Sequence, residues 1–350
     1  MDGKPSRALV LVFHGSRQNG AKHRKFPGGV FDAPADDGGA VVVYLDGHRG
    51  HWNDARRHSS FAARKENIDD VAFTRSVIGR LTDSHHIDPR RVFAVGYSNG
   101  GQMVMRLAHE TPELVAGAVV IAATMPVPED FLPADAPPAP MPVMLIHGTK
   151  DPIIRYEGGE MSWWVRTLFR GGGRSLSVPR TAAYFAARNG ITGEPVSVSL
   201  PKRAGSDGRT WVERTDHRQP ERPPVVLYTV HGGGHTIPGP AKGPAVIGRT
   251  SQDVNTADLI AAFFGIRDTR LTPSGVAPAN PRRPAAVTCP PVVPRPVLGS
   301  SGRAARRRAA RPGVGAARPV RRPPRPAVTE PSRSAVFPHS GASVVTASRA

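Results

Sequence analysis

The segment that decides the fold is Arg91-Val-Phe-Ala-Val-Gly-Tyr-Ser-Asn-Gly-Gly-Gln-Met-Val-Met-Arg-Leu107. It begins with an apolar run of strand length and ends in a segment with helical spacing of apolar residues (103–107). Between them, Gly96, Ser98 and Gly100 satisfy the pattern G-x-S-x-G, in which small residues permit a strained turn that lifts the serine above a strand. The segment therefore predicts a strand, a sharp turn and a helix, with Ser98 as a candidate nucleophile.

The pattern alone is a weak indication. In a chain with 37 glycines, G-x-S-x-G would arise by chance at roughly a one-in-five level. An alternative interpretation is a glycine-rich turn whose serine only caps the following helix. The presence or absence of partner residues elsewhere in the chain distinguishes these two interpretations.

Apolar runs of strand length alternate with helical patterns along the chain. The expected strands are 8–13, 40–45, 92–95, 114–123, 142–146, 196–200 and 225–230. The expected helices start near Asn67, with Asp70 three residues on, cover 181–188, and follow Asn255. This order predicts an α/β fold in which a mostly parallel sheet carries helices on both faces and functional loops at the carboxyl ends of its strands.

The net charge of +19 is concentrated in the last 80 residues, where fourteen arginines face a single acid, Glu330. The same stretch holds fifteen prolines and one aromatic residue, so it cannot bury enough apolar surface to offset the entropy of ordering. We therefore expect a folded domain over 1–268 and a disordered tail over 269–350. Alternative interpretations of the tail are an arginine-rich arm (303–325) that binds polyanions weakly, and a biased reading frame.

Two later residues are suitable partners for the serine. A serine hydroxyl needs a base to take its proton, and a histidine needs a carboxylate to hold its tautomer and stabilise its cation. Asp151 lies in a turn just after the predicted strand 142–146, and His235 lies in a glycine-rich loop just after the predicted strand 225–230. The order Ser98, Asp151, His235 is that of the catalytic triad in α/β-hydrolases, which is therefore the predicted fold.

Weaker candidates exist for each partner: His231 for the base, and Asp54 or Asp216 for the acid. An acyl-transfer site also needs donors for the oxyanion of its tetrahedral intermediate. These are usually the backbone N–H after the nucleophile and one from the loop after an early strand, which correspond to Asn99 and Ser16. The alternative for Ser16 is a simple turn serine.

The segments that carry these residues resemble one esterase family over about residues 8 to 266. The matching segments are His14-Gly15, Trp52-Asn53-Asp54, Asp69-Asp70-Val71, Asp88-Pro-Arg-Arg-Val, Gly96-Tyr-Ser-Asn-Gly-Gly, His147-Gly148 with Asp151, Tyr184 to Gly190, Gly232-Gly-Gly-His-Thr-Ile-Pro-Gly and Phe263-Phe264. They resemble polyhydroxybutyrate depolymerases and the related feruloyl and acetylxylan esterases, including LpqC-like lipoproteins. The resemblance implies a serine carboxylic-ester hydrolase acting on a hydroxyalkanoate polyester, or alternatively on a feruloyl or acetyl ester of a plant polysaccharide.

The chain departs from this family at several positions. Ser16 and Ile191 stand where members usually have cysteines, and Ile237 stands where they commonly have tryptophan. The resemblance implies that position 237 contacts the substrate and that Trp52 lines the cleft, although a packing role is the alternative for Trp52. Four large apolar residues in 161–173 are expected to form either a lid or an ordinary packed helix.

The family usually has a signal peptide and one or two strands before the His-Gly strand, and neither is found here. The resemblance implies an extracellular protein, whereas the N-terminal residues lack a signal-peptide core and no run of 18 apolar residues occurs, which favours a cytoplasmic one without a membrane span. The single cysteine, Cys289, leaves the body without a disulfide.

No metal or cofactor is expected, and the expected partner is an ester substrate. A different functional class is a non-catalytic module of the same fold whose basic tail binds polyanions. A peptidase is a further alternative.

Overall fold

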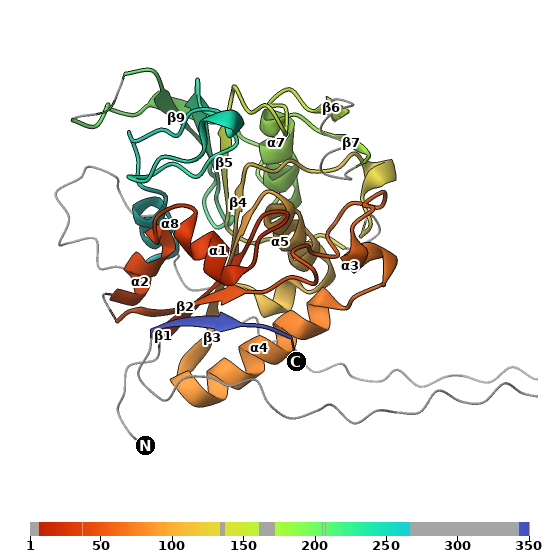
Figure 1. The fold of residues 1–350 in the computed structure, drawn as a ribbon. Coiled ribbons are helices and arrows are strands. Elements are labelled where there is room, and N and C mark those ends of the chain that lie inside the picture. Colours follow the sequence, from red (N-terminus) through yellow and green to blue (C-terminus); the bar gives the residue numbers. More distant parts are fainter. Residues whose placement is uncertain are drawn as a thin grey trace, which may run out of the picture. The chain divides into compact units, whose positions relative to one another are not determined.

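One nine-stranded sheet organises the part of the chain that the computed structural model describes (Figure 1), namely residues 7–36, 38–133, 137–160, 172–204, 206, 208–266 and 343–349. Its strands are β1 (Arg7–Phe13), β2 (Ala40–Leu45), β3 (Ile87–Tyr97), β4 (Gly117–Ile121), β5 (Val143–Gly148), β8 (Val196–Ser199), β9 (Trp211–His217), β10 (Val225–His231) and β11 (Val344–Ala347). They lie in the order β11-β2-β1-β3-β4-β5-β10-β9-β8. Neighbours from β11 to β10 pair in parallel, and β9 and β8 pair antiparallel at one edge. The predicted mostly parallel sheet is confirmed.

Helices connect the strands and cover the sheet. They are α1 (Gly20–Lys25), α2 (Ala33–Asp36), α3 (Ala62–Lys65), α4 (Asp70–His85), α5 (Asn99–Glu110), α7 (Val178–Arg188) and α8 (Thr256–Phe264). A separate two-stranded ribbon joins β6 (Gly159–Glu160) to β7 (Arg174–Ser175). Within the described ranges, no helix is long and apolar enough to cross a membrane. The expected lid, in 161–173, lies almost wholly outside the described residues.

Successive side chains of each strand point to opposite faces of the sheet, so each strand contributes to two apolar clusters. In β1, Leu9, Leu11 and Phe13 join a cluster with residues of α4, α5 and α7. Val10 and Val12 join a second cluster with residues of α8. The sheet therefore carries helices on both faces, as the sequence predicts.

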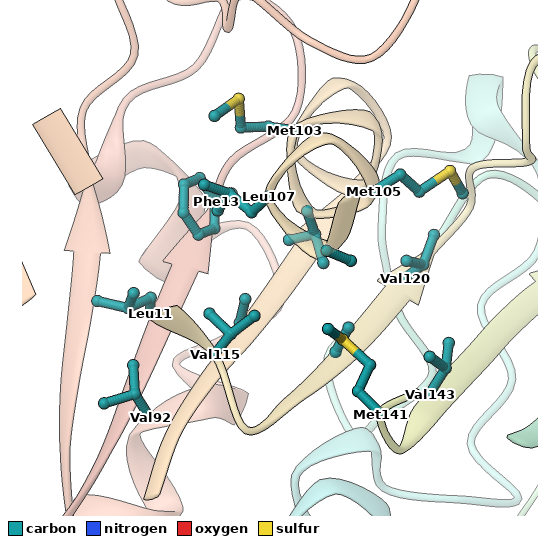
Figure 2. Packing of buried hydrophobic residues seen from close by; sticks show 14 of the residues in the cluster. Leu11, Phe13, Val92, Met103, Met105, Leu107, Val115, Val120, Met141 and Val143 are labelled. Carbon is teal, nitrogen blue, oxygen red and sulfur yellow. The ribbon is translucent and has the colours of Figure 1, made fainter. Parts of the chain in front are cut away.

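Helix α5 presses the elbow segment against the sheet. Its Met103, Met105 and Leu107 have no exposed surface, and Figure 2 shows them above the strands in the cluster that also holds Phe13 of β1. Burial of such a side chain stabilises the fold by about 1.5 to 3 kcal/mol. This packing holds the start of α5, and with it Ser98, at the carboxyl ends of the parallel strands.

The start of α4 differs from the prediction. Asn67 lies in a left-handed turn (φ 49°), and Asp69 caps the helix by accepting a hydrogen bond from the Ala72 N–H at 2.8 Å. Asp70 is not a capping-box residue but is fully buried, where its carboxylate accepts the Asn53 N–H. A contact distant in sequence, which a local capping pattern does not contain, determines the role of this carboxylate.

Helix α7 ends at the predicted Arg188 but begins at Val178 rather than at 181, whereas both ends of α8 agree with the prediction. Asn255 caps α8 by accepting the Ala257 N–H, and Gly265 ends that helix in a left-handed conformation. Strand β9 was not expected, because its sequence Trp-Val-Glu-Arg-Thr-Asp-His lacks an apolar run. It forms because β10 offers it an antiparallel partner over seven residues.

The C-terminal strand β11 was also not expected. It pairs in parallel with β2, burying Val345 and Ala347, while the Arg349 guanidinium pairs with the Asp70 carboxylate and lies over the Phe73 ring. The expectation of a tail without regular structure therefore does not hold for residues 344–347; residues 267–342 lie outside the described part. The average composition of the tail does not reveal the short β-branched run at 344–346. That run covers the edge of β2, whose backbone groups would otherwise lack partners.

We predict that Val345→Asp destabilises the domain, whereas Thr346→Asp does not. Val345 faces the core and Thr346, its neighbour on the same strand, is exposed. Since a carboxylate cannot stay buried there, β11 should detach, and the free energy of unfolding should fall by about 3 kcal/mol. Urea unfolding of the two variants measures this difference, and equal midpoints would show that β11 does not contribute to the fold.

Candidate active site

Ser98 occupies a strained turn between β3 and α5. Its backbone has φ 54° and ψ −116°, a conformation that residues with a side chain rarely adopt. The glycines beside it are required by space, because a Cβ at Gly96 would lie 2.2 Å from the Gly100 oxygen and one at Gly100 would lie 2.1 Å from the Phe13 oxygen. The structure thus has the sharp turn that G-x-S-x-G predicts.

His235 and Asp151 meet Ser98 at the same edge of the sheet. His235 Nε2 lies 3.0 Å from Ser98 Oγ, and His235 Nδ1 lies 2.7 Å from Asp151 Oδ2. Strands β5 and β10, which carry the acid and the histidine, are neighbours, and their loops are joined by the Lys150 N–H donating to the Gly233 oxygen at 2.8 Å. Adjacent parallel strands therefore bring together residues that are 84 positions apart.

Asp151 is buried and held from two sides. Its Oδ1 accepts the N–H groups of Ile153 and Ile154, both at 2.8 Å, while Oδ2 faces His235 and lies 3.4 Å from His147 Nε2. Burial alone would raise the pKa of Asp151, but the charge and hydrogen bond of His235, with help from His147 and the Ile154 N–H, hold it below its ordinary value. The carboxylate is thus kept ionised beside the imidazole.

The weaker candidates for base and acid lie elsewhere. The His231 ring stacks on Trp211 with ring centres 3.6 Å apart. Asp216 pairs with Arg214 and Arg218. Asp54 pairs with the buried Arg56 and accepts a hydrogen bond from Asn99 rather than from His235. His231, Asp216 and Asp54 therefore do not take the positions that His235 and Asp151 occupy beside Ser98.

A shallow, open pocket lies beside Ser98. It is lined by Ser16, Arg56, Phe61, Ser98, Asn99, Gln102, Ala123, Ile153 and Ile154. The backbone N–H groups of Ser16 and Asn99, the two expected oxyanion donors, have no acceptor among the described residues. Ser16 and Asn99 therefore lie beside Ser98, and their backbone N–H groups have no acceptor within the described part of the chain.

Two predicted substrate contacts are not found in this pocket. The Trp52 side chain has no exposed surface, packs edge-on against Phe13 and does not line this pocket, which favours the packing alternative. Ile237 is buried and lines a different, smaller hollow beside Phe26 and Thr236. Its position after the base did not determine which hollow it faces, because the loop turns between them.

Four residues near Ser98 escaped the sequence interpretation. Tyr97 donates to the His235 oxygen at 2.7 Å, and His147 contacts Asp151. Gln102 and Arg56 line the pocket. Tyr97 stands inside the elbow motif and Gln102 two residues after it, so both could have been proposed from it, but nothing local marks Arg56. Among the described residues, no group of three or more histidine, cysteine or acidic side chains could hold a metal ion.

His14 shapes the loop that carries Ser16. Its Nε2 accepts the Gly47 N–H at 2.8 Å, so Nδ1 carries the proton and donates to the Gly15 oxygen at 2.7 Å. Burial lowers the pKa of His14 to about 4, against the opposing effect of the bond to Gly15. A neutral imidazole is therefore built into the base of the site.

The fold and the Ser98 group define an α/β-hydrolase. Residues 3–165 match the model of the phospholipase/carboxylesterase family. Over 267 residues the chain is 33% identical to the "Putative esterase NocK" of Nocardia uniformis subsp. tsuyamanensis, covering 74% of each protein. The chain belongs to the same esterase family as this relative, and it is a serine carboxylic-ester hydrolase.

The chain is also similar, more distantly, to two polysaccharide-related esterases by name. The chain is 28% identical over 202 residues to feruloyl esterase B of Piromyces equi, covering 56% of this chain and 34% of that protein. The solved structure of an acetyl xylan esterase from Aspergillus awamori matches 75% of this chain and 90% of its own, at 14% identity and a TM-score of 0.46.

We predict that Gly100→Ala prevents correct formation of the elbow. The added Cβ would lie 2.1 Å from the Phe13 oxygen, so either β1 or α5 must move, at a cost of several kcal/mol in the free energy of unfolding. Gly79→Ala in α4 is the control, because its Cβ meets nothing within 4 Å and alanine favours helix by up to about 1 kcal/mol. Equal thermal stability of the two variants would contradict the close contact at Gly100.

We also predict that acid destabilises this protein well above pH 4. Burial lowers the pKa of His14 and His109 to about 4 and that of His23 to about 3, from 6.5 in the unfolded chain. Below pH 6.5 these histidines are therefore protonated in the unfolded chain but not in the folded chain. The free energy of unfolding should fall by about 1.4 kcal/mol per pH unit for each histidine.

Urea unfolding at pH 7.5, 6 and 5 measures this loss. His109→Gln should reduce the dependence of the unfolding free energy on pH by the contribution of one histidine, about 1.4 kcal/mol per pH unit. A stability that stays constant over this range would contradict the prediction.

Proposed function

We propose that Ser98 is the nucleophile of this esterase, His235 its general base and acid, and Asp151 the carboxylate that orients the histidine. The supporting observation is the chain of contacts Asp151–His235–Ser98 at 2.7 and 3.0 Å, placed on a strained elbow at the side of a pocket. The bond to Asp151 leaves Nε2 unprotonated and directed at Ser98, which is the state that a base requires.

The reaction proceeds through an acyl-enzyme. Ser98 Oγ bonds to the ester carbonyl carbon while its proton moves to His235 Nε2, and the carbonyl π electrons become an oxyanion. The oxyanion collapses, the bond to the alcohol oxygen breaks, and that oxygen takes the proton from Nε2. A water then attacks the acyl-enzyme in the same way and releases the acid and Ser98.

The N–H groups of Ser16 and Asn99 act as the oxyanion donors. Support comes from their position in the wall of the Ser98 pocket and from the lack of an acceptor for either group among the described residues. Loss of one such donor typically raises the barrier by about 3 kcal/mol. Because both donors are backbone groups, side-chain substitution does not remove them directly.

For the substrate we propose an ester with a short hydroxylated acyl group, as in hydroxyalkanoate oligomers. Gln102 lines the pocket and donates Nε2–H to the Thr124 oxygen at 2.7 Å, which leaves its buried Oε1 without a partner among the described residues. A buried acceptor without a partner is unfavourable, and a hydroxyl on the acyl chain would satisfy it once the Gln102 side chain turns Oε1 toward the pocket. Apolar side chains, among them Phe61, Ala123 and Ile153, also line the pocket beside the polar ones, which suits a short alkyl chain.

A second candidate is a feruloyl or acetyl ester of a polysaccharide. The observation that favours it is the similarity to feruloyl esterase B, together with a 24% identical match over 155 residues to a bifunctional acetylxylan esterase/xylanase from Neocallimastix patriciarum.

We predict that Ser98→Ala lowers the rate of p-nitrophenyl acetate hydrolysis by at least about 1,000-fold, because alanine lacks the hydroxyl that forms the acyl-enzyme. Ser84→Ala is the matched control, since Ser84 is an exposed serine on α4 whose hydroxyl bonds within its own helix. Release of p-nitrophenol by the full chain and both variants is the measurement. Substantial activity in Ser98→Ala would refute the assignment of the nucleophile.

We further predict a preference of about tenfold in kcat/KM for p-nitrophenyl 3-hydroxybutyrate over p-nitrophenyl butyrate, the effect of one hydrogen bond. Gln102→Leu should abolish the preference without lowering kcat/KM for the butyrate ester. A higher kcat/KM for methyl ferulate than for either butyrate ester would favour the second candidate instead.

A further inference from the structure

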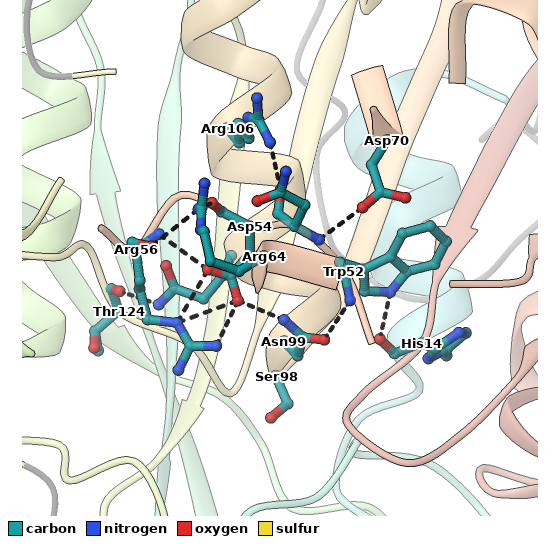
Figure 3. A network of polar contacts seen from close by, with 12 residues as sticks. His14, Trp52, Asp54, Arg56, Arg64, Asp70, Ser98, Asn99, Arg106 and Thr124 are labelled. Atoms are coloured by element: carbon teal, nitrogen blue, oxygen red, sulfur yellow. Dashed lines mark hydrogen bonds and ion pairs between the residues drawn. The ribbon is translucent and has the colours of Figure 1, made fainter. Parts of the chain in front are cut away.

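The segment 52–56 joins the two loops that carry the proposed oxyanion donors (Figure 3). On one side, the Trp52 indole Nε1–H donates to the His14 oxygen at 3.0 Å, two residues before Ser16. On the other side, the Trp52 backbone N–H donates to Asn99 Oδ1 at 2.9 Å. A single buried residue therefore contacts both the Ser16 loop and the residue that follows the nucleophile.

Asp54 holds the other end of the Asn99 side chain. Asn99 Nδ2 donates to Asp54 Oδ2 at 2.5 Å, so both polar ends of the Asn99 amide are bonded to segment 52–56. Asp54 has no exposed surface, and its carboxylate also accepts the Arg56 guanidinium and the Arg56 backbone N–H. The Asn99 side chain is thus fixed by a fully paired buried carboxylate.

Segment 52–56 is itself anchored by charged residues that lie farther from Ser98. Asn53 donates its N–H to Asp70 at 2.6 Å and accepts Arg106 Nη1 at 2.6 Å. Arg64 donates to the backbone oxygens of Asp54 and Arg56. Figure 3 shows these side chains surrounding the segment on the side away from Ser98. The segment is a rigid support rather than a loop free to follow the substrate.

We propose that Trp52, Asp54 and the side chain of Asn99 are positioning residues that set the spacing between the Ser16 and Asn99 N–H groups. This proposal rests on the proposed function, which assigns those two groups to the oxyanion. An oxyanion donor is effective only within about 0.4 Å of its best distance, and a misplacement of about 1 Å can lower the rate by about 100-fold. The Asn99 side chain and the Asn99 N–H belong to one residue, so bonds that fix the first also fix the second.

The test compares Asn99→Ala with Asn189→Ala in the full chain. Asn189 is equally buried, and its side chain also bridges backbone groups, those of Met141 and Pro223, but away from Ser98. We expect Asn99→Ala to lower kcat for p-nitrophenyl acetate by about tenfold with KM changed less than about threefold, and Asn189→Ala to lower the melting temperature with kcat unchanged.

A transition-state probe separates positioning from general loosening. An alkyl trifluoromethyl ketone forms a tetrahedral adduct on Ser98 whose oxygen occupies the oxyanion position. Its inhibition constant should rise in Asn99→Ala by the same factor by which kcat/KM falls, and should not change in Asn189→Ala. An unchanged inhibition constant and kcat in Asn99→Ala would overturn the proposal.

Exchange of the two polar partners provides a rescue. Asn99→Asp places a carboxylate against Asp54 and should lose more activity than Asn99→Ala. Adding Asp54→Asn restores one donor and one acceptor across the same contact but removes the acceptor of Arg56 Nη2, so it should recover only part of the kcat lost in Asn99→Asp. If the double variant is no more active than Asn99→Asp, the contact does not position the donor.

The Ser98→Ala variant, measured beside these, distinguishes a failure of the positioning role from a failure of the proposed function. If Ser98→Ala is inactive while Asn99→Ala is fully active, the positioning role fails and the proposed function stands. If Ser98→Ala remains active, the proposed function itself fails.

Discussion

The contact between the backbones of Gly100 and Phe13 is the constraint on which the site depends. With no room for a Cβ at Gly100, the first turn of α5 lies directly against the end of β1. This contact places Ser98 beside the loop that follows β1, and hence beside Ser16. The strain at Ser98 is maintained because α5 is buried along its length by Met103, Met105 and Leu107.

Two titratable groups under the site, His14 and Asp151, are buried and fully paired. His14 is kept neutral with both ring nitrogens bonded, whereas Asp151 is kept ionised by His235 and two backbone N–H groups. Buried charges without partners are strongly destabilising, so each of these groups is held in one protonation state. The same arrangement makes the site rigid, since no group can move without losing a partner.

Asp70 connects the site to a part of the chain that is distant in sequence. Its carboxylate accepts the Asn53 N–H on one side and pairs with Arg349 on the other. Burial is the main cause that raises the pKa of Asp70, and the charge of Arg349 opposes it. Strand β11 therefore both covers the edge of β2 and supplies a cation for a carboxylate that supports segment 52–56.

The sequence by itself determined the strand–turn–helix at Ser98, the order of Ser98, Asp151 and His235, and the parallel sheet, because each depends on residues that are neighbours or on a simple alternation of apolar runs. Only the tertiary structure decided that Trp52 is buried rather than in the cleft, that Ile237 faces another hollow, and that Arg56 and Gln102 line the pocket. It also decided that 344–347 pair with β2. These features depend on which segments meet across the sheet, and a local pattern carries no information about a partner that lies tens or hundreds of residues away.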